Sequence, residues 1–157
     1  MTVITHPRRK NRLAGMIDSP GGISVGVALE QARANIEVLR GQAMTVVDAG
    51  IAALEALPAP SSLAETPGRL DQAYRASTSL LDAAGPFELF DLCRAAAGLC
   101  DLIGAIDPEQ PFDWRIVTVH ARSLRLLQSL PPEAVQERAR ILESLNEVIE
   151  RKLNQPG

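Results

Sequence analysis

The spacing of apolar side chains predicts helices along most of the chain. From Ser24 to Leu57, apolar or small residues recur every three or four positions, which is the spacing of one face of an α-helix. A helix of this length is roughly 50 Å long, well beyond the usual helix of a globular domain. Gly41 and Gly50 weaken its interior, and Pro58 ends it. The positions predicted on this seam are Val25, Leu29, Ala32, Ile36, Leu39, Ala43, Val46, Gly50, Leu54 and Leu57.

Four shorter helices are predicted after the long one, and proline or glycine stands at their boundaries. Thr66 and Pro67 are typical of a helix start, as a cap and a first helical residue, and Gly85 is typical of a residue just past a helix end. The predicted ranges are residues 66–84, 87–106, 113–130 and 132–153. The side chains predicted to face inward include Leu70, Ala73, Tyr74, Ser77, Leu80 and Leu81 on the first of these helices, and Val135, Ala139, Leu142, Leu145, Ile149 and Leu153 on the last.

The order of these elements predicts an all-α fold. No stretch alternates apolar and polar residues as a strand does, and short links between long amphipathic helices favour antiparallel neighbours. We therefore expect an up-and-down antiparallel four-helix bundle with about five helices and a long first helix. Residues 1–22 lack periodicity and contain prolines and glycines, so we expect a flexible basic N-terminal arm, with one helical turn near residues 11–17. Residues 23–157 form the predicted helical domain.

Composition and charge narrow the function classes. The chain is 46% hydrophobic but only 3% aromatic, which suits close helix packing. Its net charge is −3, which argues against general nucleic-acid binding. The arm carries RRKNR, which fits acidic surfaces, although short basic termini are common. No apolar run is long enough to span a bilayer and no signal peptide is visible, so we expect no membrane insertion and a cytoplasmic location.

The usual catalytic motifs are missing from the sequence. It contains no glycine-rich phosphate loop, no HExxH pair and no cysteine cluster with zinc spacing, so we expect neither a cofactor nor an enzyme. Cys93 and Cys100 are seven residues apart on one predicted helix, roughly 10 Å, which is too far for a disulfide. We predict two small side chains on a buried stripe. His120 shares the phase of Ile116 and Leu124, which predicts a hydrogen-bonded, partly buried core residue.

Residues 77–93, STSLLDAAGPFELFDLC, combine the end of one helix, a glycine break and the start of the next. The stretch resembles the pattern H-x-L-K-G-S-A-G-N-F-G-L-x-x-L of histidine phosphotransfer (HPt) domains, which are four-helix bundles. More narrowly, the chain resembles small accessory proteins of alphaproteobacterial chemotaxis operons, of the CheE type. The resemblance covers about twenty residues and otherwise rests on the bundle topology. The matching residues are Leu80, Ala84, Gly85, Phe87, Leu89 and Leu92.

The departures from this pattern bear on the chemistry. The phosphoacceptor histidine falls on Thr78, the lysine on Leu81, and the glycine that admits a receiver domain falls on Asp82. Thr78 has no imidazole, Leu81 supplies no charge, and Asp82 adds a negative side chain. The resemblance therefore implies a non-catalytic adaptor of two-component or chemotaxis signalling. Its partner would be a response-regulator receiver domain or a histidine kinase, bound through Thr78, Leu81 and Asp82, with Leu81 or Phe90 as exposed apolar anchors.

Two other functions fit the same sequence. The first is an active phosphotransfer protein that uses His120 with Arg122 and Arg125 nearby, and it requires an exposed imidazole. The second is a structural or scaffolding bundle that forms a homodimer through part of the seam of the long helix, where Gly41 and Gly50 permit close helix approach.

Overall fold

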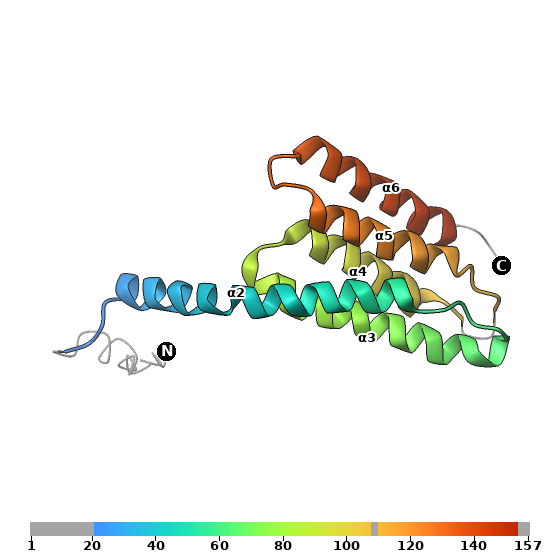
Figure 1. Cartoon of the computed structure of the whole chain (residues 1–157), viewed down its shortest axis with the longest axis horizontal. Coiled ribbons are helices and arrows are strands. Elements are labelled where there is room, and N and C mark those ends of the chain that lie inside the picture. Colours follow the sequence, from blue (N-terminus) through green and yellow to red (C-terminus); the bar gives the residue numbers. More distant parts are fainter. Residues whose placement is uncertain (1–20, 108–109, 154–157) are drawn as a thin grey trace, which may run out of the picture. The chain divides into compact units, whose positions relative to one another are not determined.

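The computed structural model describes residues 21–107 and 110–153, and within these ranges the chain is helical and contains no strand (Figure 1). The all-α prediction is confirmed for this part of the chain. The arm and its predicted turn near residues 11–17 lie almost wholly outside the described residues. The helices are α2 (Val25–Ala56), α3 (Thr66–Ala84), α4 (Phe90–Ala105), α5 (Arg115–Ser129) and α6 (Val135–Leu153), with the short 3₁₀ helices η1 (Leu63–Glu65) and η2 (Gly85–Phe87).

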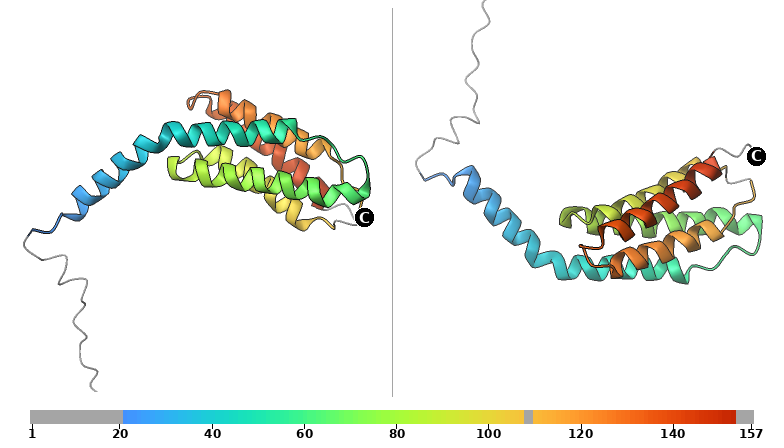
Figure 2. Two further views of the ribbon diagram at one scale, coloured as in Figure 1. Left: turned by 60° about the horizontal axis from the view of Figure 1, so that its bottom comes forward. Right: turned by 90° about the horizontal axis from the view of Figure 1, so that it is seen from above.

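The chain divides into two compact units, Met1–Val38 and Leu39–Gly157, and α2 contributes to both. In the first unit, every residue from 21 to 38 is exposed. The second unit contains the hydrophobic core, and its successive helices run in alternating directions (Figures 1 and 2). Within it α4 packs against α3, α5 and α6, and α5 also packs against α6. The second unit therefore carries most of the stabilising contacts.

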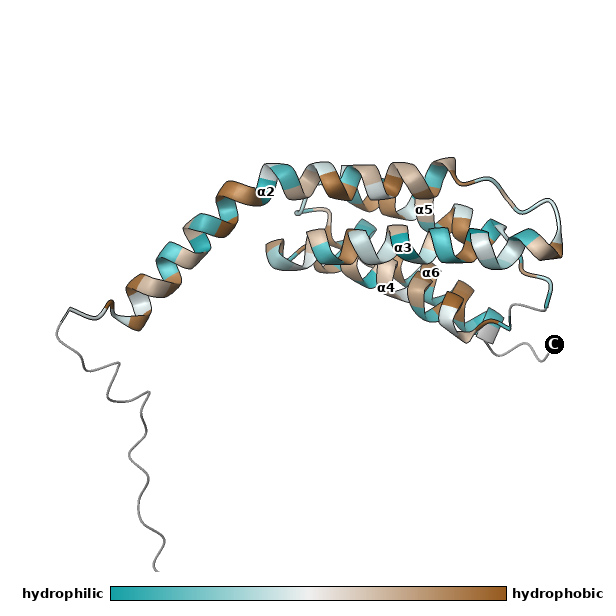
Figure 3. Cartoon of the chain, turned by 90° about the horizontal axis from the view of Figure 1, so that it is seen from below, coloured by the Kyte–Doolittle hydropathy of each residue, from teal (hydrophilic) through white to brown (hydrophobic). Residues whose placement is uncertain are grey.

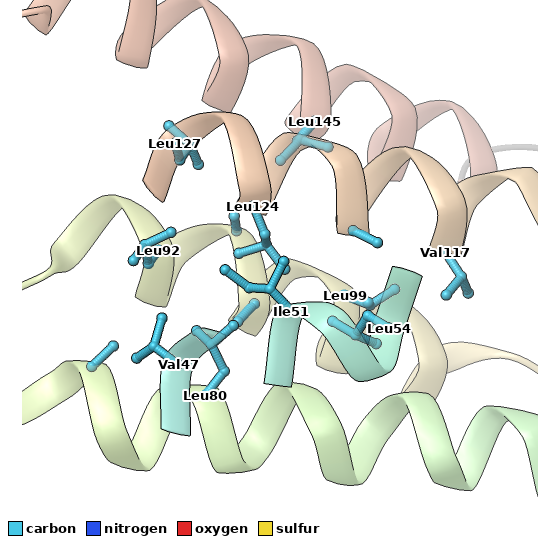
Figure 4. Close-up of a cluster of buried hydrophobic side chains, with 14 of the residues drawn as sticks. Val47, Ile51, Leu54, Leu80, Leu92, Leu99, Val117, Leu124, Leu127 and Leu145 are labelled. Atoms are coloured by element: carbon cyan, nitrogen blue, oxygen red, sulfur yellow. The ribbon is translucent and has the colours of Figure 1, made fainter. Parts of the chain in front are cut away.

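Aliphatic side chains from all five helices fill the core (Figure 4). Complete burial of one such side chain stabilises a fold by about 1.5–3 kcal/mol. Figure 3 shows hydrophobic and hydrophilic residues interspersed along each of these helices, and the polar or charged residues that are buried among the described ones are Thr66, Ser77 and His120. Core members that are almost completely buried include Val47, Ile51 and Leu54 of α2, Leu80 of α3, Leu92 and Leu99 of α4, Val117, Leu124 and Leu127 of α5, and Leu145 of α6.

Some predicted inward positions are wrong, because periodicity fixes the face of a helix only approximately. Tyr74, Val135 and Ala139 are exposed. On α2, Val46 is 43% exposed, whereas its neighbour Val47 is fully buried. The buried stripe of α2 consists of Val47, Gly50, Ile51 and Leu54, so it is rotated from the predicted seam at Val46.

The boundaries of α3 agree with the prediction, but the break after it differs. Gly85 keeps helical backbone angles (φ −57°, ψ −49°) and begins η2. The left-handed residue that reverses the chain is Glu88, with φ 58° and its amide donating to the Gly85 carbonyl at 3.1 Å. Consequently α4 starts at Phe90 rather than Phe87. Thr66 is the first residue of α3 rather than its cap, and its hydroxyl donates to the Ser62 carbonyl.

Gly50 allows α2 to approach α3 closely within one chain. A Cβ at this position would lie 3.4 Å from the Ala76 carbonyl oxygen and 3.5 Å from Leu80 Cβ, whereas a Cβ at Gly41 would meet nothing within 4 Å. The close approach expected at Gly50 therefore occurs against α3.

We expect Gly50→Leu to destabilise the protein, because a large side chain must displace α3 from α2. Overpacking of this kind costs about 1–3 kcal/mol of unfolding free energy. The matched control is Gly41→Leu, which adds the same side chain in open space and gains helix propensity, so it should be neutral or stabilising. Urea denaturation measures both variants. Equal destabilisation by the two would contradict the close contact at Gly50.

Candidate functional site

The hairpin formed by α3, η2 and α4 contains most of the sequence-predicted site. Phe87 anchors its turn, since it is 8% exposed and its ring lies beneath the Arg40 guanidinium, 5.0 Å from Cζ to the ring centroid. Such a cation–π contact stabilises both partners. Past the left-handed turn, the Leu89 carbonyl accepts from the Cys93 amide at 3.0 Å, which starts the new helix. The hairpin is thus held to the core at its tip.

Thr78, which aligns with the histidine of the HPt pattern, is half-buried and hydrogen-bonded. Its Oγ1 donates to the Tyr74 carbonyl at 3.0 Å and lies 4.0 Å from Cys100 Sγ. The neighbouring Ser77 is fully buried and donates to the Ala73 carbonyl at 2.9 Å. These are intrahelical bonds that hydroxyl side chains commonly form on helices. The arrangement gives neither hydroxyl the adjacent base that activates a nucleophile.

The two cysteines are half-buried and free. Burial raises the pKa of Cys93 and of Cys100, although the nearby hydroxyls of Thr78 and Ser77 oppose the rise at Cys100. Both thiols are therefore protonated at neutral pH, and a protonated thiol is a poor nucleophile and a poor metal ligand. The expectation of two small side chains on a buried stripe is met only in part, since both cysteines are half-buried rather than buried.

The remaining predicted residues fall into two places. Asp82 is exposed, whereas Leu81 is half-buried and packs against the core. Little of the Leu81 side chain is therefore left for the predicted role of an exposed apolar anchor. Phe90 is 64% exposed and lines a groove of about 370 Å³. Thr78, Leu81 and Asp82 do not line that groove. Its walls are Met44, Glu88, Leu89, Phe90, Asp91, Leu92, Leu127, Gln128, Leu130, Pro132 and Arg138.

An ion pair that sequence reasoning missed forms one wall of the Phe90 groove. Arg138 Nε of α6 donates to Asp91 Oδ2 of α4 at 2.6 Å. Its Nη1 also donates to the carbonyls of Leu127 and Leu130, at 2.8 and 3.0 Å, and so satisfies the end of α5. One mostly buried guanidinium therefore joins three helices. The sequence contains one indication that Arg138 faces inward. Its spacing from Leu142 and Leu145 places all three residues on the same face of α6.

His120 lies inside the core, with no exposed surface. Its Nδ1 is 2.8 Å from the Ile116 carbonyl oxygen, which assigns the proton to Nδ1, and its buried Nε2 has no hydrogen-bond partner in the structure. Burial lowers the pKa of His120, against the smaller opposing effect of the Ile116 carbonyl. The expected hydrogen-bonded core histidine is confirmed, and it is more deeply buried than expected.

The alternative phosphoacceptor role of His120 required an exposed imidazole, and the structure contradicts that requirement. Its proposed basic neighbours are engaged elsewhere or face solvent. Arg125 pairs with Glu55 at 2.8 Å and with Asp48, both on α2, and these hydrogen bonds raise its pKa. Arg122 is exposed. A receiver domain therefore has no access to the imidazole in this structure.

Comparison with protein families, with characterised proteins and with solved structures finds no match for this chain. Among the described residues, no three histidine, cysteine or carboxylate side chains gather where they could share a metal ion. No helix within residues 21–107 and 110–153 combines the length and the apolar character that crossing a membrane requires.

We expect Arg138→Met to lower the unfolding free energy by about 2–3 kcal/mol, because it leaves Asp91 and two carbonyls without their charged partner. The control is Arg140→Met on the same helix, whose exposed side chain should contribute less than about 0.5 kcal/mol. Chemical denaturation monitored by circular dichroism measures the difference. If Arg138→Met lowered the unfolding free energy no more than Arg140→Met does, Arg138 would act only as a surface charge.

Stability should also depend on pH through His120. Its folded-state pKa is below the ordinary value of 6.5, so the unfolded state binds the proton more readily. The unfolding free energy should therefore be highest above pH 6.5 and fall as the pH drops toward the folded pKa, by at most about 1.4 kcal/mol per pH unit. Denaturation at a series of pH values tests this. The slope between pH 6.5 and 5 should disappear in His120→Leu, and an unchanged slope would contradict the assignment.

Proposed function

We propose that this chain is a non-catalytic, HPt-like adaptor of two-component or chemotaxis signalling that works in the cytoplasm. Its α3–α4 hairpin docks a response-regulator receiver domain or a histidine kinase, and no phosphoryl group is relayed. The proposal starts from the resemblance of residues 77–93 to the HPt pattern, and from the three substitutions at Thr78, Leu81 and Asp82.

The observation that carries the proposal is the backbone at Glu88. It is the only residue other than glycine with a positive φ in the described part of the chain, at 58°. In the HPt pattern the glycine that follows the break aligns with this position. Glycine adopts positive φ at no steric cost, whereas glutamate pays a penalty for it. The chain thus keeps the turn geometry that the pattern's glycine favours, although its residue is different.

The helix arrangement of the second unit gives further support for an antiparallel four-helix bundle. The carboxyl-terminal part of α2 contacts α3 at Gly50 and α5 through Arg125, and α4 packs against both α3 and α5. These contacts are consistent with four helices arranged around one core. We propose that α6, which packs against α4 and α5, is an addition to this bundle.

The surroundings of Thr78 support the proposed lack of phosphotransfer. A receiver exchanges its phosphoryl group with an exposed imidazole nitrogen, and Thr78 offers a half-buried hydroxyl that donates within its own helix. The surface next to Thr78 carries the exposed Asp82, where the HPt pattern has a glycine that lets a receiver domain approach closely. In our proposal Asp82 contacts the partner, and Phe90 supplies the apolar anchor at the amino-terminal end of α4.

We expect Phe90→Ala to weaken partner binding by tenfold or more, since removal of a central aromatic anchor commonly costs upward of about 1.4 kcal/mol. The matched control is Leu63→Ala in η1, which also truncates an exposed apolar side chain. Titration calorimetry against purified receiver domains and kinase domains from the same organism measures both. Asp82→Arg should weaken binding as well. If no receiver or kinase binds the full chain, the proposal is wrong.

Phosphotransfer is tested in the same assay. A radiolabelled phospho-receiver that binds this chain should keep its label, and no acid-labile phosphate should appear on the chain. Transfer of label to the full chain would contradict the non-catalytic function, whatever residue accepts it. A known phosphotransfer domain that accepts label from the same receiver serves as the positive control.

A further inference from the structure

One side of α4 stays open although the helix packs against α3, α5 and α6. We define the α4 stripe as the exposed or half-exposed residues on this side, which recur every three or four positions from one end of the helix to the other. Residues with this spacing form one continuous strip on a helix, and here the strip is about two heptads long. Its members are Phe90, Arg94, Ala97, Gly98, Asp101, Gly104 and Ala105.

The two charged residues of the α4 stripe have opposite signs and lie at equal distances from its midpoint. Arg94 and Asp101 are both exposed, and within the described part of the chain neither forms an ion pair. They are seven residues apart, which is roughly 10 Å along the helix, so they do not pair with each other. Both charges are therefore available to opposite charges on another molecule.

The uncharged members of the α4 stripe are complementary in size. Phe90 projects at one end and is 64% exposed, whereas the other end carries the small residues Gly104 and Ala105. A Cβ at Gly104 would meet nothing within 4 Å, so the surface there is open. Ala97 and Gly98 lie at the midpoint and line a groove of about 370 Å³ between α4 and α6. Small residues let another helix approach closely, and a large side chain fills the space over small ones.

These features favour a second copy of this chain, because the α4 stripe is complementary to its own reverse. We propose that α4 pairs with α4 of a second copy in the antiparallel orientation, about a two-fold axis at its midpoint. Arg94 of each copy then faces Asp101 of the other, and each Phe90 ring lies over Gly104 and Ala105. In a parallel, in-register pair, Arg94 would face Arg94 and Asp101 would face Asp101, and these like charges repel.

This dimer goes beyond the proposed signalling function and does not depend on it. Its surface is on α4 and not on the seam of the long helix. The two proposals share Phe90, so a receiver or kinase that docks there would compete with the second copy for this side chain. Sedimentation of the purified chain measures the dimer, whereas calorimetry measures partner binding, so a failure of either proposal is distinguishable from a failure of the other.

Sedimentation equilibrium of the full chain at low ionic strength tests the dimer through its charges. Arg94→Asp and Asp101→Arg should each raise the dimer dissociation constant by at least about tenfold, because each places like charges opposite one another on both sides of the axis. The double variant Arg94→Asp/Asp101→Arg exchanges the two charges, so its dissociation constant should return to within about threefold of the wild-type value.

The matched control for these charge reversals is Arg122→Asp, which reverses an exposed arginine of α5 outside the stripe and should change the dissociation constant less than about twofold. Recovery in the double variant also shows that neither substitution unfolds the chain. A wild-type chain that stays monomeric up to about 0.5 mM overturns the proposal, and so does a double variant that dimerises no better than the single ones.

Gly104→Gln tests the antiparallel arrangement without a change of charge. The added side chain occupies the space assigned to Phe90 of the second copy, so the dissociation constant should rise by at least about fivefold. In the monomer that space is open, and glutamine favours a helix over glycine, so the fold should not be weakened. The control is Gly68→Gln on α3, an exposed helical glycine in equally open surroundings. A Gly104→Gln dimer as tight as the Gly68→Gln dimer contradicts this arrangement.

Discussion

The burial of α4 on three sides is the constraint on which the second unit depends. This helix contacts α3, α5 and α6, and its inward residues alternate large and small side chains, such as Leu92, Ala96 and Leu99. Alanine lets neighbouring helices come close, and leucine fills the space between them. The ion pair of Arg138 with Asp91 fixes the amino-terminal end of α4 to α6 and to the end of α5. The end of α4 that carries Phe90 is thus joined to two other helices.

The sequence predicts the helices well because their signals are local. Thr66, Pro67 and the run of spaced apolar residues predict α3 to within one residue at its start, and the phase of His120 predicts its burial. The turn after α3 was misplaced because Gly85 is the residue expected to reverse the chain, whereas Glu88 does so. The choice of Val47 over Val46 for the core depends on neighbouring helices, and a single helix pattern contains no such information.

The candidate site was harder to predict than the fold. Arg138 and Asp91 are 47 residues apart, and no local rule joins them. Thr78, Leu81 and Asp82 are near one another because they share one turn of α3, but Phe90 belongs to a separate groove whose walls come from four helices and their connections. Comparison of the sequence with the HPt pattern identifies the side chains that differ from it. Only the packing of the helices determines which of them face solvent.

Arg125 has a consequence for the order in which the second unit forms. Its partners Glu55 and Asp48 are 70 and 77 residues away along the chain, whereas α3 and α4 are joined by a short turn. Closing a long loop costs entropy before its contacts repay it, so local pairs such as the α3–α4 hairpin are favoured early. The arginine then reaches its two carboxylates when α5 docks beside α2. If this link between distant segments forms late, we expect it to slow unfolding more than it speeds folding.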